Sequence, residues 1–178
     1  EDRQLLAVIV DTALDVVDIP PTGTIIDLPG PDGVVSLREA LIACNNDSGA
    51  DDISFDTAGV FATPQTMALT LGELAITDPV TIHGPGADYL AIDAEGNSRV
   101  LNIDDGLTSQ SDVTLSGLTI TGGRTTADYD SGGGIRNWEN LTLTESAVAD
   151  NSTAGYAAYG GGIFSYPGNL TVTDSAIA

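Results

Sequence analysis

The residues of this sequence with the greatest capacity for chemistry are its carboxylates. The chain has 26 acidic residues, five arginines, one histidine and no lysine. Two carboxylates that flank a sugar linkage can hydrolyse it, and several that converge can bind Ca²⁺. A lyase of acidic polysaccharides would need calcium-binding carboxylates together with a lysine or arginine base. Each of these sites requires carboxylates that the fold brings together.

The adjacent acidic doublets do not by themselves predict such a site. Asp51-Asp52 and Asp104-Asp105 are neighbours in sequence, and adjacent residues of a strand point to opposite faces of a sheet. We interpret Asp51-Asp52 as residues that help a turn lead into a strand. Asp104-Asp105-Gly106 is typical of a turn.

Nucleophilic chemistry also lacks its partners in this sequence. His83 is the one histidine, no serine or cysteine motif accompanies it, and the Gly84-Pro85-Gly86 turn follows it. Cys44 is the one cysteine, which excludes an intramolecular disulfide and a cysteine metal cluster. We interpret His83 as a polar residue beside a turn and Cys44 as a small buried apolar residue. We predict no catalytic residues and no cofactor-binding residues.

Two loop aspartates, Asp128 and Asp130, are weak candidates for calcium ligands. The repeats described below lack the glycine- and aspartate-rich nonapeptide of calcium-binding β-helices, so solvated loop carboxylates are the favoured interpretation. Apart from this calcium candidate, we predict no cofactor.

Aromatic residues gather in the last third of the chain. Exposed rings on one side of a protein can stack on sugars or contact another protein. Packing within turns explains the same pattern equally well, so both interpretations stay open. The residues are Tyr129, Trp138, Tyr156, Tyr159 and Tyr166.

The charge of the chain excludes some partners. A net charge of −21 makes nucleic acid and anionic membrane surfaces poor ligands, because their recognition requires clustered positive charge. The sequence has no apolar run of about 18 residues, so we predict no membrane insertion of this segment.

Any such site must be positioned by a repeating fold. GGGIRNWENLTLTESAVADN begins at Gly132, and the similar GGGIFSYPGNLTVTDSAIA begins at Gly160. LAITDPVTIHG from Leu74 and VTLSGLTITGG from Val113 align with the later LTLTESAVADN and LTVTDSAIA. The copies that begin at Gly132 and Gly160 are 28 residues apart. Short strands, polar turns and variable insertions at a repeat of this length predict a parallel β-helix.

Alternating apolar residues mark the expected strands from Asp51 onward. Each pair below places two apolar side chains on one face of a short strand. The pairs are Ile53/Phe55, Leu69/Leu71, Leu74/Ile76, Val80/Ile82, Leu90/Ile92, Leu101/Ile103, Val113/Leu115 and Leu118/Ile120.

The N-terminal residues predict a cap on this coil. Residues 5–10 favour a strand, and a second short strand is expected around residues 23–27. Ser36-Leu37-Arg38-Glu39 is a capping box that begins a short amphipathic helix at about 36–46. This helix should cover the open end of the coil, with Arg38 paired to a carboxylate. We therefore expect one β-helix domain over 1–178, with a cap in 1–50 and rungs in 51–178.

The order of these motifs resembles a known family. SLREALIACNN, ADDISFD, VTIHGPGADYLAID, SRVLNI and VTLSGLTITGG are similar to segments of bacterial secreted proteins that carry a CSLREA motif before right-handed parallel β-helix repeats. These proteins are related to polymorphic outer-membrane and probable extracellular repeat proteins. The cysteine of the motif is Val35 here, so the disulfide inferred for that motif is absent. The resemblance brings no established catalytic residues.

The resemblance implies a secreted, extracellular or cell-surface protein with a structural or adhesive role and no enzymatic activity. We expect the chain to be the N-terminal part of a longer protein. We also expect its last rung, which has no cap in the sequence, to allow end-to-end self-association into a coat or fibre. A glycan or another cell-surface molecule is a further candidate partner. Two alternatives remain: a polysaccharide-active enzyme, pectate-lyase-like or a glycoside hydrolase, and a calcium-dependent glycan-binding module.

Overall fold

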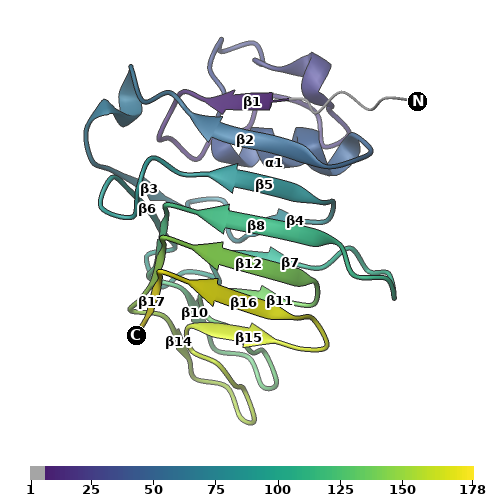
Figure 1. Ribbon diagram of the computed structural model, residues 1–178, viewed down its shortest axis with the longest axis vertical. Helices are drawn as coiled ribbons and strands as arrows, with labels where there is room; N and C mark the ends of the chain where they lie inside the picture. Colours follow the sequence, from purple (N-terminus) through teal and green to yellow (C-terminus); the bar gives the residue numbers. More distant parts are fainter. Residues whose placement is uncertain (1–6) are drawn as a thin grey trace.

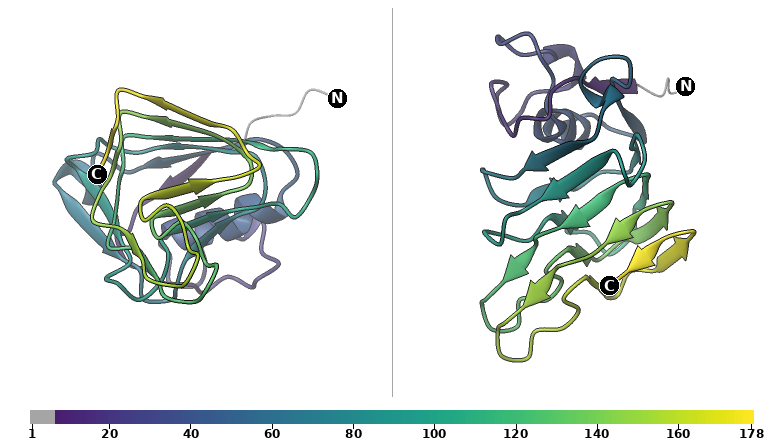
Figure 2. Two further views of the ribbon diagram at one scale, coloured as in Figure 1. Left: turned by 90° about the horizontal axis from the view of Figure 1, so that it is seen from below. Right: turned by 90° about the vertical axis from the view of Figure 1, so that its left-hand side faces the viewer.

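A computed structural model describes residues 7–178, and they form the right-handed parallel β-solenoid with a short helix that the sequence predicts. The chain completes about five turns, which lie one below another along the long axis of the molecule (Figure 1). Viewed down that axis, the turns superimpose around a common interior (Figure 2).

Three parallel sheets, here called faces A, B and C, run the length of the coil. Face A contains β1 (Ala7–Val10), β2 (Asp51–Phe55), β5 (Val80–His83), β8 (Asp112–Ser116), β12 (Asn140–Thr144) and β16 (Leu170–Thr173). Face B contains β3 (Gln65–Ala68), β6 (Leu90–Asp93), β9 (Thr119–Thr121), β13 (Ala147–Val148) and β17 (Ala176–Ile177). Face C contains β4 (Leu74–Ile76), β7 (Leu101–Ile103), β11 (Ile135–Asn137) and β15 (Ile163–Ser165).

The core consists of inward side chains that repeat from turn to turn. On face A, Ile82 pairs with Leu115, which pairs with Leu143, and each is at most 1% exposed. Burying one such side chain contributes roughly 1.5–3 kcal/mol, and no single turn could enclose it alone. The stacking of turns is therefore what creates the interior.

The turn from face A to face B has the same backbone shape in successive rungs. Gly117, Glu145 and Asp174 follow β8, β12 and β16, and their φ angles are 63°, 49° and 49°. Glycine adopts this left-handed region freely, whereas the two acidic residues adopt it at a cost. The repeated shape lets each turn stack on the next.

The register corrects the alignment of the first repeat. Val80, and not Leu74, is the partner of Val113, because Leu74 begins a face C strand that pairs with Leu101. Two different corners of the coil have similar sequences, because each separates two short apolar runs. One lies between β4 and β5, and the other lies between β8 and β9. The strand expected at Leu69/Leu71 is also wrong, since β3 ends before them and Leu71 is exposed in a turn.

The helix α1 (Leu37–Asn46) begins at the predicted capping box. Ser36 Oγ accepts a hydrogen bond from the Glu39 amide, and Glu39 Oε2 accepts one from the Ser36 amide. The expected apolar stripe of α1 is buried against the first turn, with Leu37, Ala40, Leu41 and Cys44 each at most 2% exposed. The strand expected in residues 5–10 is β1 over its described part, and residues 5 and 6 lie outside the described residues.

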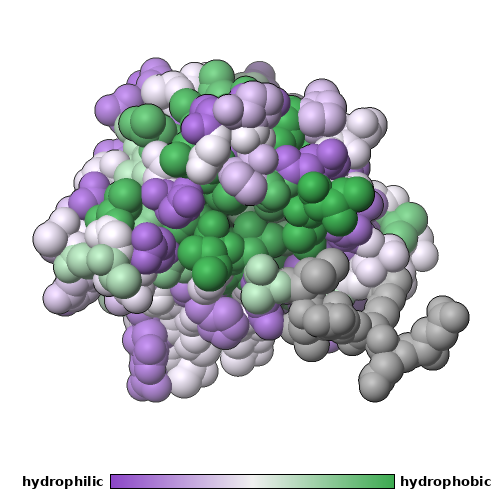
Figure 3. All heavy atoms as spheres, turned by 90° about the horizontal axis from the view of Figure 1, so that it is seen from above, coloured by the Kyte–Doolittle hydropathy of each residue, from purple (hydrophilic) through white to green (hydrophobic). Residues whose placement is uncertain are grey.

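The second N-terminal strand, expected around residues 23–27, is wrong. Ile25–Asp27 form a 3₁₀ turn instead. Thr24 precedes it, and the Asp27 carboxylate accepts hydrogen bonds from both the amide and the hydroxyl of Thr24. The hydrogen bonds between Thr24 and Asp27 therefore outweigh the preference of Ile25 and Ile26 for a strand. The N-terminal end of the molecule carries a group of apolar side chains at its surface (Figure 3). In the N-terminal segment, Ile9 and Ile26 are exposed.

Candidate functional site

The predicted aromatic residues lie in loops at two corners of the coil. Three of them follow the short strands β10 (Arg124–Thr125) and β14 (Ser152–Thr153), which pair in parallel between faces B and C. Tyr129, Tyr156 and Tyr159 are 71%, 72% and 65% exposed. They form what we call the tyrosine cluster.

Hydrogen bonds donated by backbone amides connect the two stacked loops that carry the tyrosine cluster. The amide of Tyr129 donates to the Tyr156 carbonyl over 2.9 Å, and the amide of Tyr156 donates to Asp128 Oδ1 over 2.8 Å. The two rings meet edge to face, with centroids 5.9 Å apart. The Tyr159 amide donates to Ser131 Oγ over 2.9 Å. Fixed loops thus present these rings to solvent.

Trp138 and Tyr166 lie at a different corner, between faces C and A. Trp138 follows β11 and its amide donates to the Ile103 carbonyl, whereas Tyr166 follows β15 and donates to the Asn137 carbonyl. Trp138 is the less exposed of the two. The five aromatic residues therefore do not make one continuous surface in the described structure.

The calcium candidates Asp128 and Asp130 are engaged in structural contacts. Asp128 accepts the Tyr156 amide, and Asp130 pairs with Arg99. Arg99 is 4% exposed and also pairs with Glu73 over 2.7 Å. Its remaining donors reach backbone carbonyls of the adjacent turn. Asp130 thus serves as a counter-ion for a buried arginine.

Within residues 7–178, one group of three carboxylates lies close enough to share an ion. The carboxylates of Asp104, Asp105 and Glu139 lie within 4.8 Å of one another. Glu139 is 2% exposed, and its two oxygens accept the amides of Asp105 and Ser111 over 3.2 and 2.7 Å. The group therefore closes the loop that follows β7.

The pKa of Asp105, one member of this group, makes it a poor general acid. Burial opposes ionisation of Asp105, but hydrogen bonds from Leu107, from Ser111 and with Glu139 outweigh it and lower the pKa of the Asp105 carboxyl. A general acid at neutral pH needs a raised pKa. Asp104 accepts the Gly106 amide over 2.9 Å, as expected of the predicted turn.

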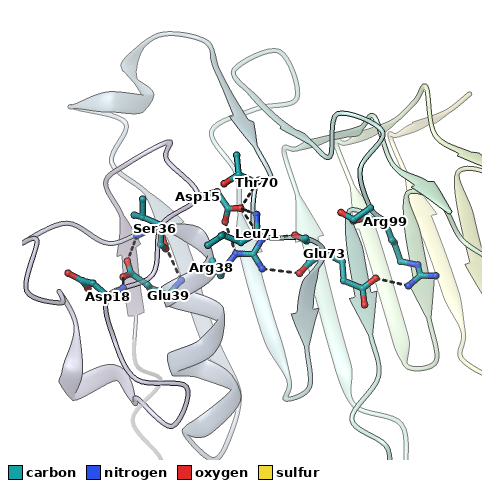
Figure 4. A network of polar contacts seen from close by, with 12 residues as sticks. Asp15, Asp18, Ser36, Arg38, Glu39, Thr70, Leu71, Glu73 and Arg99 are labelled. Atoms are coloured by element: carbon teal, nitrogen blue, oxygen red, sulfur yellow. Dashed lines mark hydrogen bonds and ion pairs between the residues drawn. The ribbon is translucent and has the colours of Figure 1, made fainter. Parts of the chain in front are cut away.

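A line of polar contacts anchors the N-terminal segment and α1 to the first turn (Figure 4). Arg38 donates to both oxygens of Asp15, at 2.6 and 3.1 Å, which confirms the predicted pairing of Arg38 with a carboxylate. Arg38 also donates to the Glu73 and Gly72 carbonyls over 2.9 and 2.6 Å. Asp15 Oδ2 accepts the amides of Thr70 and Leu71 over 2.7 and 2.8 Å.

His83 and Asp51, on neighbouring strands of face A, differ in their exposure. His83 ends β5 and is exposed, with its Nε2 atom 3.6 Å from Asp52 Oδ1. Asp52 faces outward, whereas Asp51 is buried inside the coil as the first residue of β2. From the sequence, we interpret Asp51 as a residue that helps a turn lead into a strand, and this interpretation does not predict that the side chain is buried. The available signal was its position two residues before Ile53, on the inward face.

The chain matches no family model, no curated protein and no solved structure. The resemblance to CSLREA-motif proteins thus stays a prediction. Among the residues that the structure describes, no helix has the length and apolar character needed to cross a bilayer.

Proposed function

We propose that this chain is an extracellular or cell-surface structural protein whose solenoid presents an adhesive surface. The observation that carries this proposal is the tyrosine cluster. Three tyrosines with most of their surface in solvent are held on two hydrogen-bonded loops. Tyrosine combines a large apolar ring with a polar hydroxyl, which suits it to contacts that must also tolerate water.

The use of buried polar side chains supports a structural role. Arg99 and Arg38 join segments far apart in the sequence, and Glu139 binds two backbone amides. Asn137 is fully buried and its amide group donates to the Glu139 carbonyl and to Ser165 Oγ of the next turn. These groups hold turns and loops together.

The charge of the chain favours an uncharged partner for the tyrosine cluster. A net charge of −21 repels polyanionic glycans, and Asp128 lies beside the rings. Neutral sugars offer apolar ring faces for stacking and hydroxyl groups for hydrogen bonds to carboxylates. We therefore expect neutral cell-surface glycans to bind in preference to acidic ones.

Binding to a panel of neutral and acidic glycans tests this proposal. We expect the double variant Tyr129→Ala/Tyr156→Ala to weaken binding at least about tenfold, which corresponds to about 1.4 kcal/mol. The matched control is Trp138→Ala/Tyr166→Ala, which removes two rings at the other corner and should leave affinity nearly unchanged. Equal losses in both variants, or no binding to any glycan in the panel, would count against the proposal.

End-to-end association of the chain stays a prediction. Analytical ultracentrifugation would test it by measuring the sedimentation coefficient at increasing protein concentration.

A further inference from the structure

An aspartate takes the place of an apolar residue in the core of the first turn. On face A, the first inward position of successive strands is occupied by Val80, Val113 and Leu141, and Asp51 pairs with Val80 in the same column. Asp51 is 5% exposed, and its Oδ2 atom has no hydrogen-bond partner. A buried carboxylate without a full set of partners is costly when it is ionised.

The groups that face Asp51 come from three elements, and most are acidic. Cys44, on α1, is 2% exposed, and its thiol and the Asp51 carboxyl each influence the other's pKa. Asp47 is the C-cap of α1, and Asp78 lies in the corner between β4 and β5. Asp52 is the next residue of β2. Ionised Asp51 would therefore experience the charges of Asp47 and Asp78 and, from the outward face of β2, that of Asp52.

The protonation of Asp51 follows from these surroundings. Burial, followed by the charges of Asp47 and Asp78, raises the pKa of the Asp51 carboxyl, and the Cys44 thiol opposes this only in part. Burial and the nearby Asp51 and Asp47 raise the pKa of Cys44 to about 12, so the thiol stays neutral. The fit of α1 over the first turn is thus best when Asp51 carries a proton.

We propose that Asp51 is a proton-linked latch that fastens the N-terminal cap, formed by β1 and α1, to the first turn of the solenoid. With Asp51 protonated, the cap is closed. Ionisation of Asp51 places an unsatisfied charge under α1 and loosens the cap while the later turns stay intact. The proposal is independent of the tyrosine cluster and of any glycan.

The sign of the pH dependence is fixed by linkage. Because the closed state holds the Asp51 proton more tightly than the open state does, the latch is fully effective below the ordinary pKa of aspartate, 3.8. Its contribution is lost as pH rises through the higher pKa of the closed state. Between the two values, the open population increases by up to about tenfold per pH unit.

Hydrogen exchange of the whole chain between pH 4 and pH 8 tests the latch. The measured quantity is the exchange rate of the α1 peptide in the native chain divided by its rate in Asp51→Asn at the same pH, which cancels the intrinsic effect of pH. We expect this ratio to rise with pH, by up to about tenfold per unit, and then to level off. The same ratio for a β12 peptide should stay constant.

Two further variants keep the test decisive. Asp51→Val restores the apolar column of Val80 and Val113, and should protect α1 at all pH values above 4 even if Asp51→Asn folds poorly. Asp112→Asn changes an exposed aspartate that begins β8 and should leave the α1 ratio unchanged. A ratio for α1 that does not vary with pH, or one that rises equally in α1 and β12, would overturn the proposal.

Discussion

The N-terminal cap and the rungs satisfy the same backbone requirement in different ways. In the rungs, each strand pairs with an equivalent strand of the next turn, as β8 does with β12. At the upper edge of β4, side chains from α1 take over this role. Asn45 donates to the Ala75 carbonyl and accepts the Thr77 amide, both within 3.0 Å. Unpaired strand edges invite association, so both arrangements protect the sheet.

Because the rungs rely on strand pairing and the cap on side-chain hydrogen bonds, the two regions should respond differently to single substitutions. A rung shares its contacts among many similar residues, and the loss of one contact leaves its neighbours in place. The cap depends on a few polar side chains, such as Arg38 and Asp15, each of which has several partners. We therefore expect the loss of the buried Arg38–Asp15 ion pair in the cap to cost as much as the loss of a core leucine in the rungs.

The largest expected effect is that of Arg38→Met. Methionine keeps part of the apolar stem but leaves Asp15, whose side chain is 1% exposed, without its counter-ion. Removal of one partner of a buried ion pair costs about 3–5 kcal/mol. Urea unfolding would measure the loss. A cost below about 1 kcal/mol would show that the ion pair does not fasten the cap.

The same ion pair predicts a pH dependence opposite to that of Asp51. Burial raises the pKa of Asp15, but the hydrogen bond from Arg38 and the amides of Thr70 and Leu71 outweigh it, so the net pKa is below 3.8. This stabilisation is present above pH 3.8 and is lost as pH falls through the lower pKa of the folded state. Below pH 4, the free energy of unfolding, measured in urea at each pH, should therefore depend less on pH in Asp15→Asn than in the native chain.

In the rungs, Leu115→Ala should cost about 2–5 kcal/mol, because it leaves a cavity between Ile82 and Leu143. Urea unfolding would again measure the loss. The exchange of α1 amides through local opening should change little, since Leu115 lies on β8 and not beneath the helix. Strong acceleration of exchange in α1 would mean that cap and rungs open as one unit.

The smallest expected effect is that of Ser36→Ala, which removes the N-cap of α1. Ser36 Oγ accepts the Glu39 amide and donates to the Val16 carbonyl over 2.7 Å. We expect a loss of about 0.5–2 kcal/mol, measured by thermal unfolding. Ser36→Thr keeps the hydroxyl and is the control. An equal loss in both variants would point to a steric cause.

The regular parts of this fold could be predicted from the sequence, whereas its exceptions could not. Alternation predicts most strands of faces A and C, although it misses β3, and the capping box locates the start of α1. The pattern could not distinguish one corner of the coil from another, so Leu74 was aligned where Val80 belongs. Nor could it reveal that the tyrosines and Trp138 occupy different corners, since this depends on how the turns stack. The inward position of Asp51, by contrast, follows from its alternation with Ile53 once β2 is taken to begin at Asp51.

Residue-resolved hydrogen exchange in low concentrations of denaturant tests most directly whether the cap is a separate unit fastened by its own side chains. We predict that amides of α1 exchange through an opening of lower free energy, and weaker denaturant dependence, than amides of β8 and β12. Exchange of cap and rung amides with one common free energy and one common denaturant dependence would contradict it.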